Sequence, residues 1–275
     1  TVHTNRGDFN CLGILIATGA HPRTVGFKGE EEHKGQGVAY CATCDGEFFT
    51  DKEIFVVGGG FAAAEESVFL TKFAKHVTIL IRKDDFSCAA SVADKAKKHE
   101  KITVITNTVI EEVSGENSLD YIRYKNTKTD EIKEYRAENG DFFGVFVFVG
   151  YSPDTKLVKD IIELNEHGYI ITDTEQKTNI NGIYAAGDVT GLMQLAHAAT
   201  RQGEVAAANL LGGTAVYHND RVPRAIYTSP EIASVGLTRI QAAEKGLTVK
   251  TKKAFLLANG RAVAQDQTDG FFELL

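Results

Sequence analysis

The 275-residue sequence predicts an α/β fold built on a doubly wound parallel sheet. The first observation is a strand, glycine turn, helix and second strand at residues 54–57, 58–60, 61–74 and 77–81. The second is that strands and helices go on alternating after this unit, which favours parallel strands. The third is length, because a chain of this size exceeds the usual single domain and predicts at least two.

Composition excludes several classes of protein. Hydrophobic residues make up 43% and charged residues 24%, as in an ordinary soluble globular protein. The net charge of -7 gives no support for nucleic-acid binding, and no apolar run approaches the 18 residues of a membrane span. Four cysteines are too few for a secreted disulfide scaffold, so we expect a cytoplasmic location.

Further elements follow in order on both sides of this unit. A buried strand at 11–17 comes first, and a polar, glycine-rich stretch at 30–38 predicts a domain crossover. After the second strand we expect a helix at 89–99, a strand at 102–106 and three short antiparallel strands at 109–113, 119–126 and 131–137. Apolar runs at 142–149 and 180–186 predict buried strands, and 192–211 a long helix. The last part is β-rich, with strands at 225–228, 232–235 and 248–256 and a short helix capped by Thr238.

Gly58, Gly60 and Ala63 have the spacing of a dinucleotide-binding turn. Gly58 permits the tight turn, Gly60 lets the backbone approach a pyrophosphate, and Ala63 lets helix and strand pack closely. The free N–H groups of the helix then receive the phosphates. A purely structural turn is the alternative, but the strand before and the helix after favour the nucleotide.

Arg82 and Lys83 end the second strand, where an NAD-selective site usually offers a carboxylate to the ribose. Two cations suit a 2′-phosphate, so NADPH is favoured, with NADH possible. The alternative is a solvated basic strand end, since Asp84 and Asp85 follow at once.

Cys41 and Cys44 form a CxxC pair that could be a redox disulfide, half of a zinc site or a coincidence. Zinc requires about four ligands, and because the sequence has no second such pair we predict no metal site. Redox chemistry is therefore favoured. Asp45 is a candidate proton donor or acceptor for the thiols, or simply a turn residue. Cys11 and Cys88 suit buried small residues.

Gly187 and Asp188 follow an apolar strand, where the carboxylate either bonds a ribose or ribityl hydroxyl or caps the next helix.

Together, these motifs resemble the thioredoxin reductase branch of the flavin-dependent pyridine nucleotide–disulfide oxidoreductases. The matching segments are Ala17-Thr18-Gly19-Ala20, Gly35-x-Gly37-Val38, Cys41-Ala42-Thr43-Cys44-Asp45-Gly46, Gly58-Gly59-Gly60, Arg82-Lys83-Asp84, Gly144-Val145-Phe146 and Ala185-Ala186-Gly187-Asp188. They occur in the family's order over residues 11 to 210.

The resemblance implies a nucleotide-binding domain at 31–139 inserted into a partial FAD-binding domain at 1–30 and 140–213. Cys44 would face the flavin, Cys41 would attack the protein disulfide, Asp45 would serve as the acid–base group and Asp188 would hold the ribityl chain. Electrons would pass from NADPH through FAD and the dithiol to a thioredoxin-like partner.

Three departures from the family pattern affect these expectations. No GxGxxG precedes Ala17, so this chain alone is expected to be incomplete and to bind FAD poorly. Ser87 stands where the family's last arginine is expected, which weakens the preference for NADPH. Leu195-Ala196-His197 and the run from 222 to 236 resemble the lipoamide dehydrogenase branch, where that run opens a dimerisation domain. We therefore add Ala196 to the cofactor-binding candidates, assign 214–275 to a partial dimerisation-like domain and expect a homodimer.

Two other functions remain open on the same residues. One is a reductase that supplies a peroxiredoxin, or a dithiol oxidase. The other is a non-catalytic fragment that binds nucleotide or senses redox state.

Overall fold

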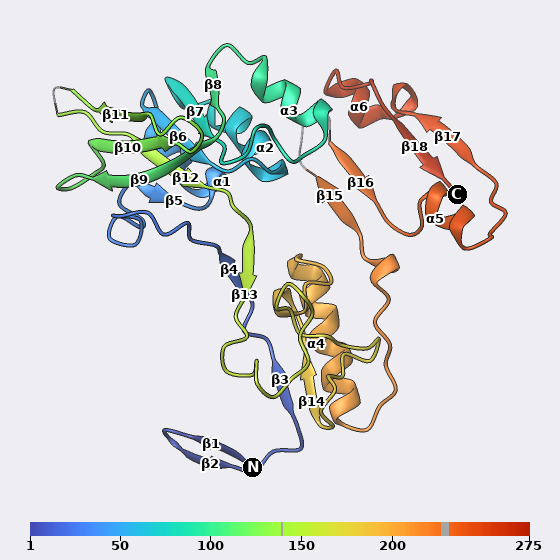
Figure 1. Cartoon of the computed structure of the whole chain (residues 1–275). Helices are drawn as coiled ribbons and strands as arrows, with labels where there is room; N and C mark the ends of the chain where they lie inside the picture. Colours follow the sequence, from blue (N-terminus) through green and yellow to red (C-terminus); the bar gives the residue numbers. More distant parts are fainter. Residues whose placement is uncertain (139, 227–230) are drawn as a thin grey trace. The chain divides into compact units, whose positions relative to one another are not determined.

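The computed structural model describes residues 1–138, 140–226 and 231–275. The chain divides into two compact units. The first unit comprises Thr1–Thr18, Val158–Asn165 and Tyr169–Leu275, and the second comprises Gly19–Leu157 with Glu166–Gly168. Figure 1 labels the helices and strands of both units.

A five-stranded parallel sheet forms the centre of the second unit, in the order β5-β12-β6-β7-β8. The strands are β5 (Val38–Ala39), β12 (Gly144–Val147), β6 (Glu53–Val57), β7 (His76–Leu80) and β8 (Ile102–Ile105). Their sequences are nearly continuous apolar runs, as expected of parallel strands that are covered on both faces.

Different layers cover the two faces of this sheet. Side chains alternate between the faces along a strand, so Ile54 and Val56 point to one and Phe55 and Val57 to the other. The first pair packs with α2 (Phe61–Leu70) and α3 (Ala90–Lys97) in one buried cluster. The second pair packs with a three-stranded antiparallel sheet in another cluster. That sheet has the order β11-β10-β9 and consists of β9 (Thr108–Ser114), β10 (Tyr121–Asn126) and β11 (Ile132–Arg136) (Figure 1).

The predicted α/β class with a parallel sheet is confirmed, and so is the antiparallel pairing after it. The predicted helix 61–74 is too long, because α2 ends at Leu70. The Thr71 hydroxyl donates to the Val68 carbonyl at 2.6 Å, and the Lys101 ammonium donates to the carbonyls of Thr71 and Ala74, both at 3.2 Å. The first bond satisfies a carbonyl in the last turn of α2, and the other two satisfy carbonyls of the segment that follows it, so neither needs further helix.

Two pairings of the second unit were not expected. Strand β4 (Ala20–Pro22) pairs antiparallel with β13 (Tyr151–Pro153). Strand β12 pairs with β6 along all four of its residues, within the sheet that carries the dinucleotide turn. The compact units thus divide the chain at other points than the domain bounds 1–30, 31–139, 140–213 and 214–275, which stay a prediction.

The first unit contains a smaller parallel pair, β3 (Ile14–Ile16) with β14 (Ile183–Ala185). Ile16, Ala185 and Val189 form its buried core with Ile162 and Ile170. Helix α4 (Ala196–Leu210) contacts both strands, and the hairpin β1 (Val2–Thr4) with β2 (Gly7–Phe9) precedes them. The predicted strand 11–17 is shorter than expected, because pairing with β14 covers three residues only.

Short elements make up the C-terminal part of the first unit. They are β15 (Arg224–Ile226), β16 (Ile232–Ser234), α5 (Arg239–Glu244), β17 (Lys252–Phe255), α6 (Gly260–Ala264) and β18 (Phe271–Leu274). Thr238 caps α5 as predicted, in a capping box with Gln241. The predicted strand 225–228 lies partly outside the described residues, and so does the middle of the run 222–236.

The described residues also include the 3₁₀ turns η1 (Gly46–Phe49), η2 (Asp188–Thr190), η3 (Asn219–Arg221) and η4 (Leu256–Ala258). Among the helices of the described ranges, none is both long and apolar enough to cross a membrane.

Candidate active site

The candidate residues of the second unit follow the ends of three parallel strands. Cys41 lies two residues after β5, Gly58 directly after β6 and Arg82 two residues after β7. Because these strands are parallel in one sheet, their carboxyl ends meet at one edge. The structure therefore brings the CxxC pair, the glycine turn and the two cations to the same edge of the sheet.

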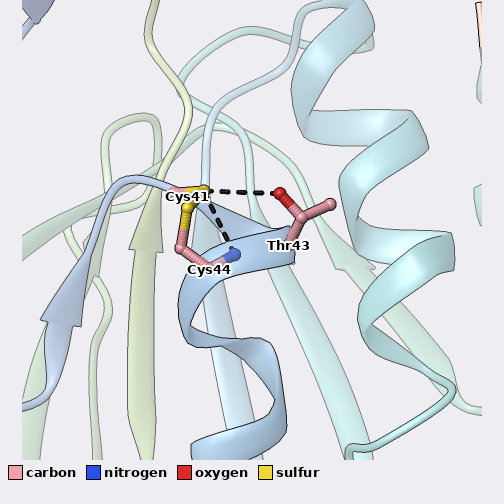
Figure 2. The surroundings of a disulfide bond; sticks show 3 residues. All are labelled: Cys41, Thr43 and Cys44. Atoms are coloured by element: carbon pink, nitrogen blue, oxygen red, sulfur yellow. Dashed lines mark hydrogen bonds between the residues drawn. A yellow bond between two sulfur atoms is a disulfide. The ribbon is translucent and has the colours of Figure 1, made fainter.

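Cys41 and Cys44 are joined by a disulfide bond, with their Cα atoms 5.3 Å apart (Figure 2). Cys41 is the N-cap of the short helix α1 (Ala42–Asp45), and its Sγ accepts a hydrogen bond from the Cys44 backbone N–H at 3.2 Å. The Thr43 hydroxyl lies 3.4 Å from the same sulfur. The N–H group stabilises negative charge on this sulfur, which favours a thiolate on Cys41 once the pair is reduced.

Packing behind the disulfide fixes the position of α1. Phe49, at the end of η1, is buried against Phe146 of β12 with ring centroids 5.5 Å apart. A Cβ at Gly144 would lie 2.8 Å from the Phe49 ring, so this strand position requires glycine. A Cβ at Gly46 would lie 2.9 Å from Leu70 of α2. The disulfide is thus held by the sheet and by α2 together.

A buried carboxylate anchors the chain immediately before the disulfide. Glu30 is 3% exposed and accepts hydrogen bonds from the backbone N–H groups of Val25 and Gly26 and from the Tyr40 hydroxyl, the last at 2.8 Å. Burial, and then the bond to the Glu30 carboxylate and its charge, raise the pKa of Tyr40 well above its usual value. Tyr40 precedes Cys41, so Glu30 fixes the backbone from which α1 begins.

Asp45 is half-buried at the end of α1, one residue after the disulfide. Its backbone N–H donates to the Cys41 carbonyl at 3.1 Å, which closes the helical turn around the two cysteines. The proton-transfer role of its carboxylate stays a prediction.

The glycine turn has a different requirement at each position. Gly58 has φ +146°, and a Cβ there would lie against the Phe148 carbonyl oxygen and 3.0 Å from the Ala63 side chain. Ala63 is fully buried where the helix meets the strand. Gly60 is the N-cap of α2, and a Cβ there would meet no atom within 4 Å. The turn therefore needs glycine at Gly58 for its own backbone, whereas Gly60 faces open space that a nucleotide backbone can approach.

Both acidic residues after the second strand are paired with lysines. Asp84 accepts a hydrogen bond from Lys128, and the carboxylate of Asp85 lies 2.6 Å from the Lys97 ammonium. The hydrogen bonds from these lysines hold the pKa of each aspartate below its usual range. Among residues 1–138, 140–226 and 231–275, neither Arg82 nor Lys83 forms an ion pair, and both are exposed. The aspartates therefore do not neutralise the two cations by direct contact.

Gly187 and Asp188 belong to the first unit. Gly187 has φ +81°, and its backbone N–H donates to the Gln202 Oε1 atom of α4 at 2.7 Å. Gln202 is fully buried, and its Nε2 atom has no hydrogen-bond partner in the described part of the chain. Asp188 is half-buried and opens η2. A buried donor without a partner beside this turn is a group that a polar ligand could satisfy.

The remaining residues named from the sequence differ in exposure. Ala196 is the first residue of α4, also in the first unit, and is exposed. Cys11 is exposed and lies before β3, so the expectation of a buried residue inside a strand is wrong for it. Cys88 is half-buried and packs against the buried cluster that the sheet forms with α2 and α3. Among the residues that the structure describes, no group of three or more His, Cys, Asp or Glu side chains could hold a metal ion.

The candidate residues thus fall into two groups, one in each unit. Sequence reasoning missed three residues. Gln202 bonds the candidate Gly187, whereas Glu30 and Lys128 bond Tyr40 and Asp84, which are next to the candidates Cys41 and Lys83. For Glu30 the available signal was a cluster of acidic residues in a predicted loop, which ordinarily indicates a solvated surface. For Gln202 and Lys128 the sequence carries no signal, since they lie 15 residues from Gly187 and 44 from Asp84.

These features define a class of α/β proteins that combine a CxxC disulfide with a dinucleotide-type turn at one sheet edge. Comparison with known proteins then identifies the family. Residues 2–203 match the family model of the pyridine nucleotide-disulphide oxidoreductases, and residues 222–275 match the model of that family's dimerisation domain. The chain belongs to the pyridine nucleotide-disulphide oxidoreductase family.

Similar proteins are thioredoxin reductases. The chain is 47% identical to that of Peptoclostridium litorale over 205 residues, which cover 74% of this chain and 65% of the relative. It is 40% identical to that of Treponema pallidum over 188 residues, covering 68% and 59%. The crystal structure of Lactococcus lactis thioredoxin reductase (FR conformation) matches with a TM-score of 0.61 at 40% identity, covering 73% of this chain and 65% of that one. The chain thus spans slightly less than two thirds of these relatives.

Proposed function

We propose that the protein is a flavoprotein disulfide reductase that passes electrons from NADPH, through FAD and the Cys41–Cys44 dithiol, to the disulfide of a thioredoxin-like protein. The observation that carries the proposal is the Cys41–Cys44 disulfide at the sheet edge that also holds the Gly58–Gly60 turn. The turn that would bind the electron donor and the disulfide that would accept the electrons are therefore parts of one folded unit.

The residues of the second unit fit NADPH. The open space at Gly60 and the start of α2 suit a pyrophosphate, because the first N–H groups of a helix have no acceptors within it. Arg82 and Lys83, exposed and without ion pairs in the described chain, suit a 2′-phosphate. The carboxylates of Asp84 and Asp85, which could otherwise favour the 2′-hydroxyl of NADH, each carry the compensating charge of a bonded lysine.

The residues of the first unit fit the polar chain of FAD. Gly187 gives the backbone a left-handed turn, Asp188 offers an acceptor for ribityl hydroxyls, and the buried Gln202 Nε2 offers a donor. Ala196, at the start of α4, would approach the flavin ring. When bound, FAD converts the two-electron transfer from NADPH into reduction of the disulfide.

We assign different roles to the two thiols. The Cys41 thiolate, stabilised by the Cys44 N–H, attacks one sulfur of the partner's disulfide; that disulfide breaks and its other sulfur leaves as a thiolate. The Cys44 thiolate then attacks the Cys41 sulfur, which restores the Cys41–Cys44 disulfide and releases the second partner thiolate. Asp45 passes to the departing thiolates the protons that the Cys41 and Cys44 thiols give up as they form the disulfide. Cys44, the more exposed of the two, is the cysteine that receives electrons from the flavin.

We further propose a thioredoxin-like partner and a homodimer in the cytoplasm. The partner follows from the similarity to proteins named thioredoxin reductase, and the homodimer from the match of residues 222–275 to a dimerisation domain. The cytoplasmic location is inferred from the low cysteine content.

The test uses the full-length protein with FAD. NADPH-driven reduction of thioredoxin should disappear in both Cys41→Ser and Cys44→Ser. The Cys44→Ser variant should also accumulate a mixed disulfide through Cys41, whereas Cys41→Ser should not. Undiminished turnover in both variants would show that the Cys41–Cys44 pair is not the acceptor. A mixed disulfide that forms only in Cys41→Ser would reverse the two roles.

A further inference from the structure

Two cations and one neutral side chain follow strand β7 near the glycine turn. Arg82 and Lys83 supply two positive charges at the end of β7. Ser87, five residues after Arg82, is bound to the turn instead: its backbone N–H and its hydroxyl donate to the Gly59 carbonyl at 2.7 and 3.1 Å. A short neutral side chain held in this way adds no charge for a phosphate dianion.

A turn distant in sequence is fastened to the same strand end. The Asn107 N–H donates to the Lys83 carbonyl at 2.9 Å. The backbone N–H and the hydroxyl of Thr127 donate to the Asn107 carbonyl at 2.6 and 3.0 Å. Thr127 opens the turn between β10 and β11, so this chain of bonds carries that turn to the residues that end β7. The residue after Thr127 is Lys128.

The turn holds Lys128 in a defined place. The Asn126 side-chain oxygen accepts from the backbone N–H groups of Lys128 and Thr129 at 2.9 and 3.1 Å, and Asp130 has a positive φ of +58°. The Lys128 ammonium reaches Asp84, the residue directly after Lys83. The Lys128 ammonium therefore lies beside Asp84, which directly follows the two strand-end cations.

The pair of Lys128 and Asp84 contributes little to stability, because both side chains are largely exposed, 60% and 74%. An ammonium group also has three donors, so a lysine bonded to one carboxylate retains donors for a phosphate. The pairing thus places Lys128 without consuming it.

We propose that Lys128 is a specificity-determining residue of the nucleotide site, and that it supplies a third cation, beside Arg82 and Lys83, for the 2′-phosphate of NADPH. The proposal rests on the proposed function, since it assumes that the Gly58–Gly60 turn binds a pyridine nucleotide. Lys128 acts by its own charge on the phosphate and not only by masking Asp84. It discriminates NADPH from NADH and takes no part in the dithiol chemistry.

The test is calorimetric titration of the full-length FAD-loaded protein with NADP⁺ and NAD⁺, which requires no turnover. Lys128→Ala should weaken NADP⁺ binding about tenfold, the size of one charge-assisted hydrogen bond at an exposed site, and leave NAD⁺ binding unchanged. Lys125→Ala is the matched control, because Lys125 lies in the same hairpin and is ion-paired with Asp130 at 2.6 Å. It should change neither affinity.

An Asp84→Asn background separates direct action from masking. Lys128→Ala should still weaken NADP⁺ binding about tenfold there, because the phosphate contact remains. The proposal is overturned if Lys128→Ala has no effect in that background, if it acts no more strongly than Lys125→Ala, or if it weakens both nucleotides equally. Failure of the wild-type protein to bind either nucleotide would instead contradict the proposed function.

Discussion

Buried polar groups are treated differently in the two units. In the second unit the Glu30 carboxylate is almost fully buried, and donors from Val25, Gly26 and Tyr40 surround it. Three buried side-chain atoms lack partners within the described ranges, and all three lie in the first unit: Thr172 Oγ1, Gln176 Oε1 and Gln202 Nε2. Buried polar atoms are normally paired. The described part of the second unit follows this rule, whereas the first unit has unpaired buried atoms that a ligand or water could satisfy.

The largest effect is expected at the turn of the second unit. Gly58→Ala should destabilise the fold by about 2–4 kcal/mol, because the new methyl group meets the Phe148 carbonyl at a backbone φ of +146°. Gly60→Ala should change stability by less than about 0.5 kcal/mol but weaken NADP⁺ binding, since its methyl group enters open space. Urea unfolding and nucleotide titration measure the two effects. Equal destabilisation by both substitutions would contradict the account of the turn.

The next effect tests the paired buried polar groups of the second unit directly. Glu30→Gln should cost about 2–4 kcal/mol in unfolding free energy, because an amide replaces one acceptor oxygen with a donor among three donors. Tyr40→Phe, which removes one of those donors and leaves the others, should cost about 1 kcal/mol. A Glu30→Gln variant as stable as the wild type would show that the carboxylate is not the anchor of this segment.

A smaller effect is expected at Gln202, one of the residues of the first unit with an unpaired buried atom. Gln202→Met removes the acceptor of the Gly187 N–H but also the unpartnered Nε2, so the two changes offset and the net cost should be about 1 kcal/mol. Asn209 is the matched control on α4, because its amide makes three hydrogen bonds to Glu175 and Ala215. Asn209→Leu should cost more, about 2–3 kcal/mol. A larger cost for Gln202→Met than for Asn209→Leu would show that Gln202 is as fully bonded as Asn209, and the contrast between the two units would be lost.

The smallest effect depends on pH. The pKa of Tyr40 is raised in the folded protein, chiefly by burial and by its bond to Glu30, so the folded state keeps a proton that the unfolded state releases near pH 10. This contribution to stability is complete below about pH 10 and falls as pH rises above it. Unfolding free energies measured from pH 8 to 11.5 should decline less steeply in Tyr40→Phe. Identical declines would mean that Tyr40 titrates normally.

Local patterns of the sequence predicted much of the second unit. The apolar runs 54–57 and 77–81, with a glycine turn and a helix between them, specify a βαβ unit because strand and helix periods are legible within a few residues. Strand β5 could not be predicted, because two residues, Val38 and Ala39, become a strand only by pairing with β12. Side-chain partners such as Glu30 for Tyr40 were equally invisible.

The site residues divide in the same way, into those that a short motif predicts and those that only the fold brings into contact. The CxxC pair and the glycine turn are short motifs, so their residues could be named from spacing alone. The partners of those residues depend on contacts over long sequence separations, which periodicity does not encode. Gln202 reaches Gly187 only because α4 packs against β14, and Lys128 reaches Asp84 only because Thr127 bonds to Asn107.

The most direct test of the central claim is a thiol count on the full-length FAD-loaded protein under anaerobic conditions. Addition of NADPH should raise the number of free thiols by two per chain as the Cys41–Cys44 disulfide is reduced. Cys41→Ser and Cys44→Ser, which lack the disulfide, should show no rise. A wild-type protein that oxidises NADPH without gaining thiols would contradict the claim that this dithiol receives the electrons.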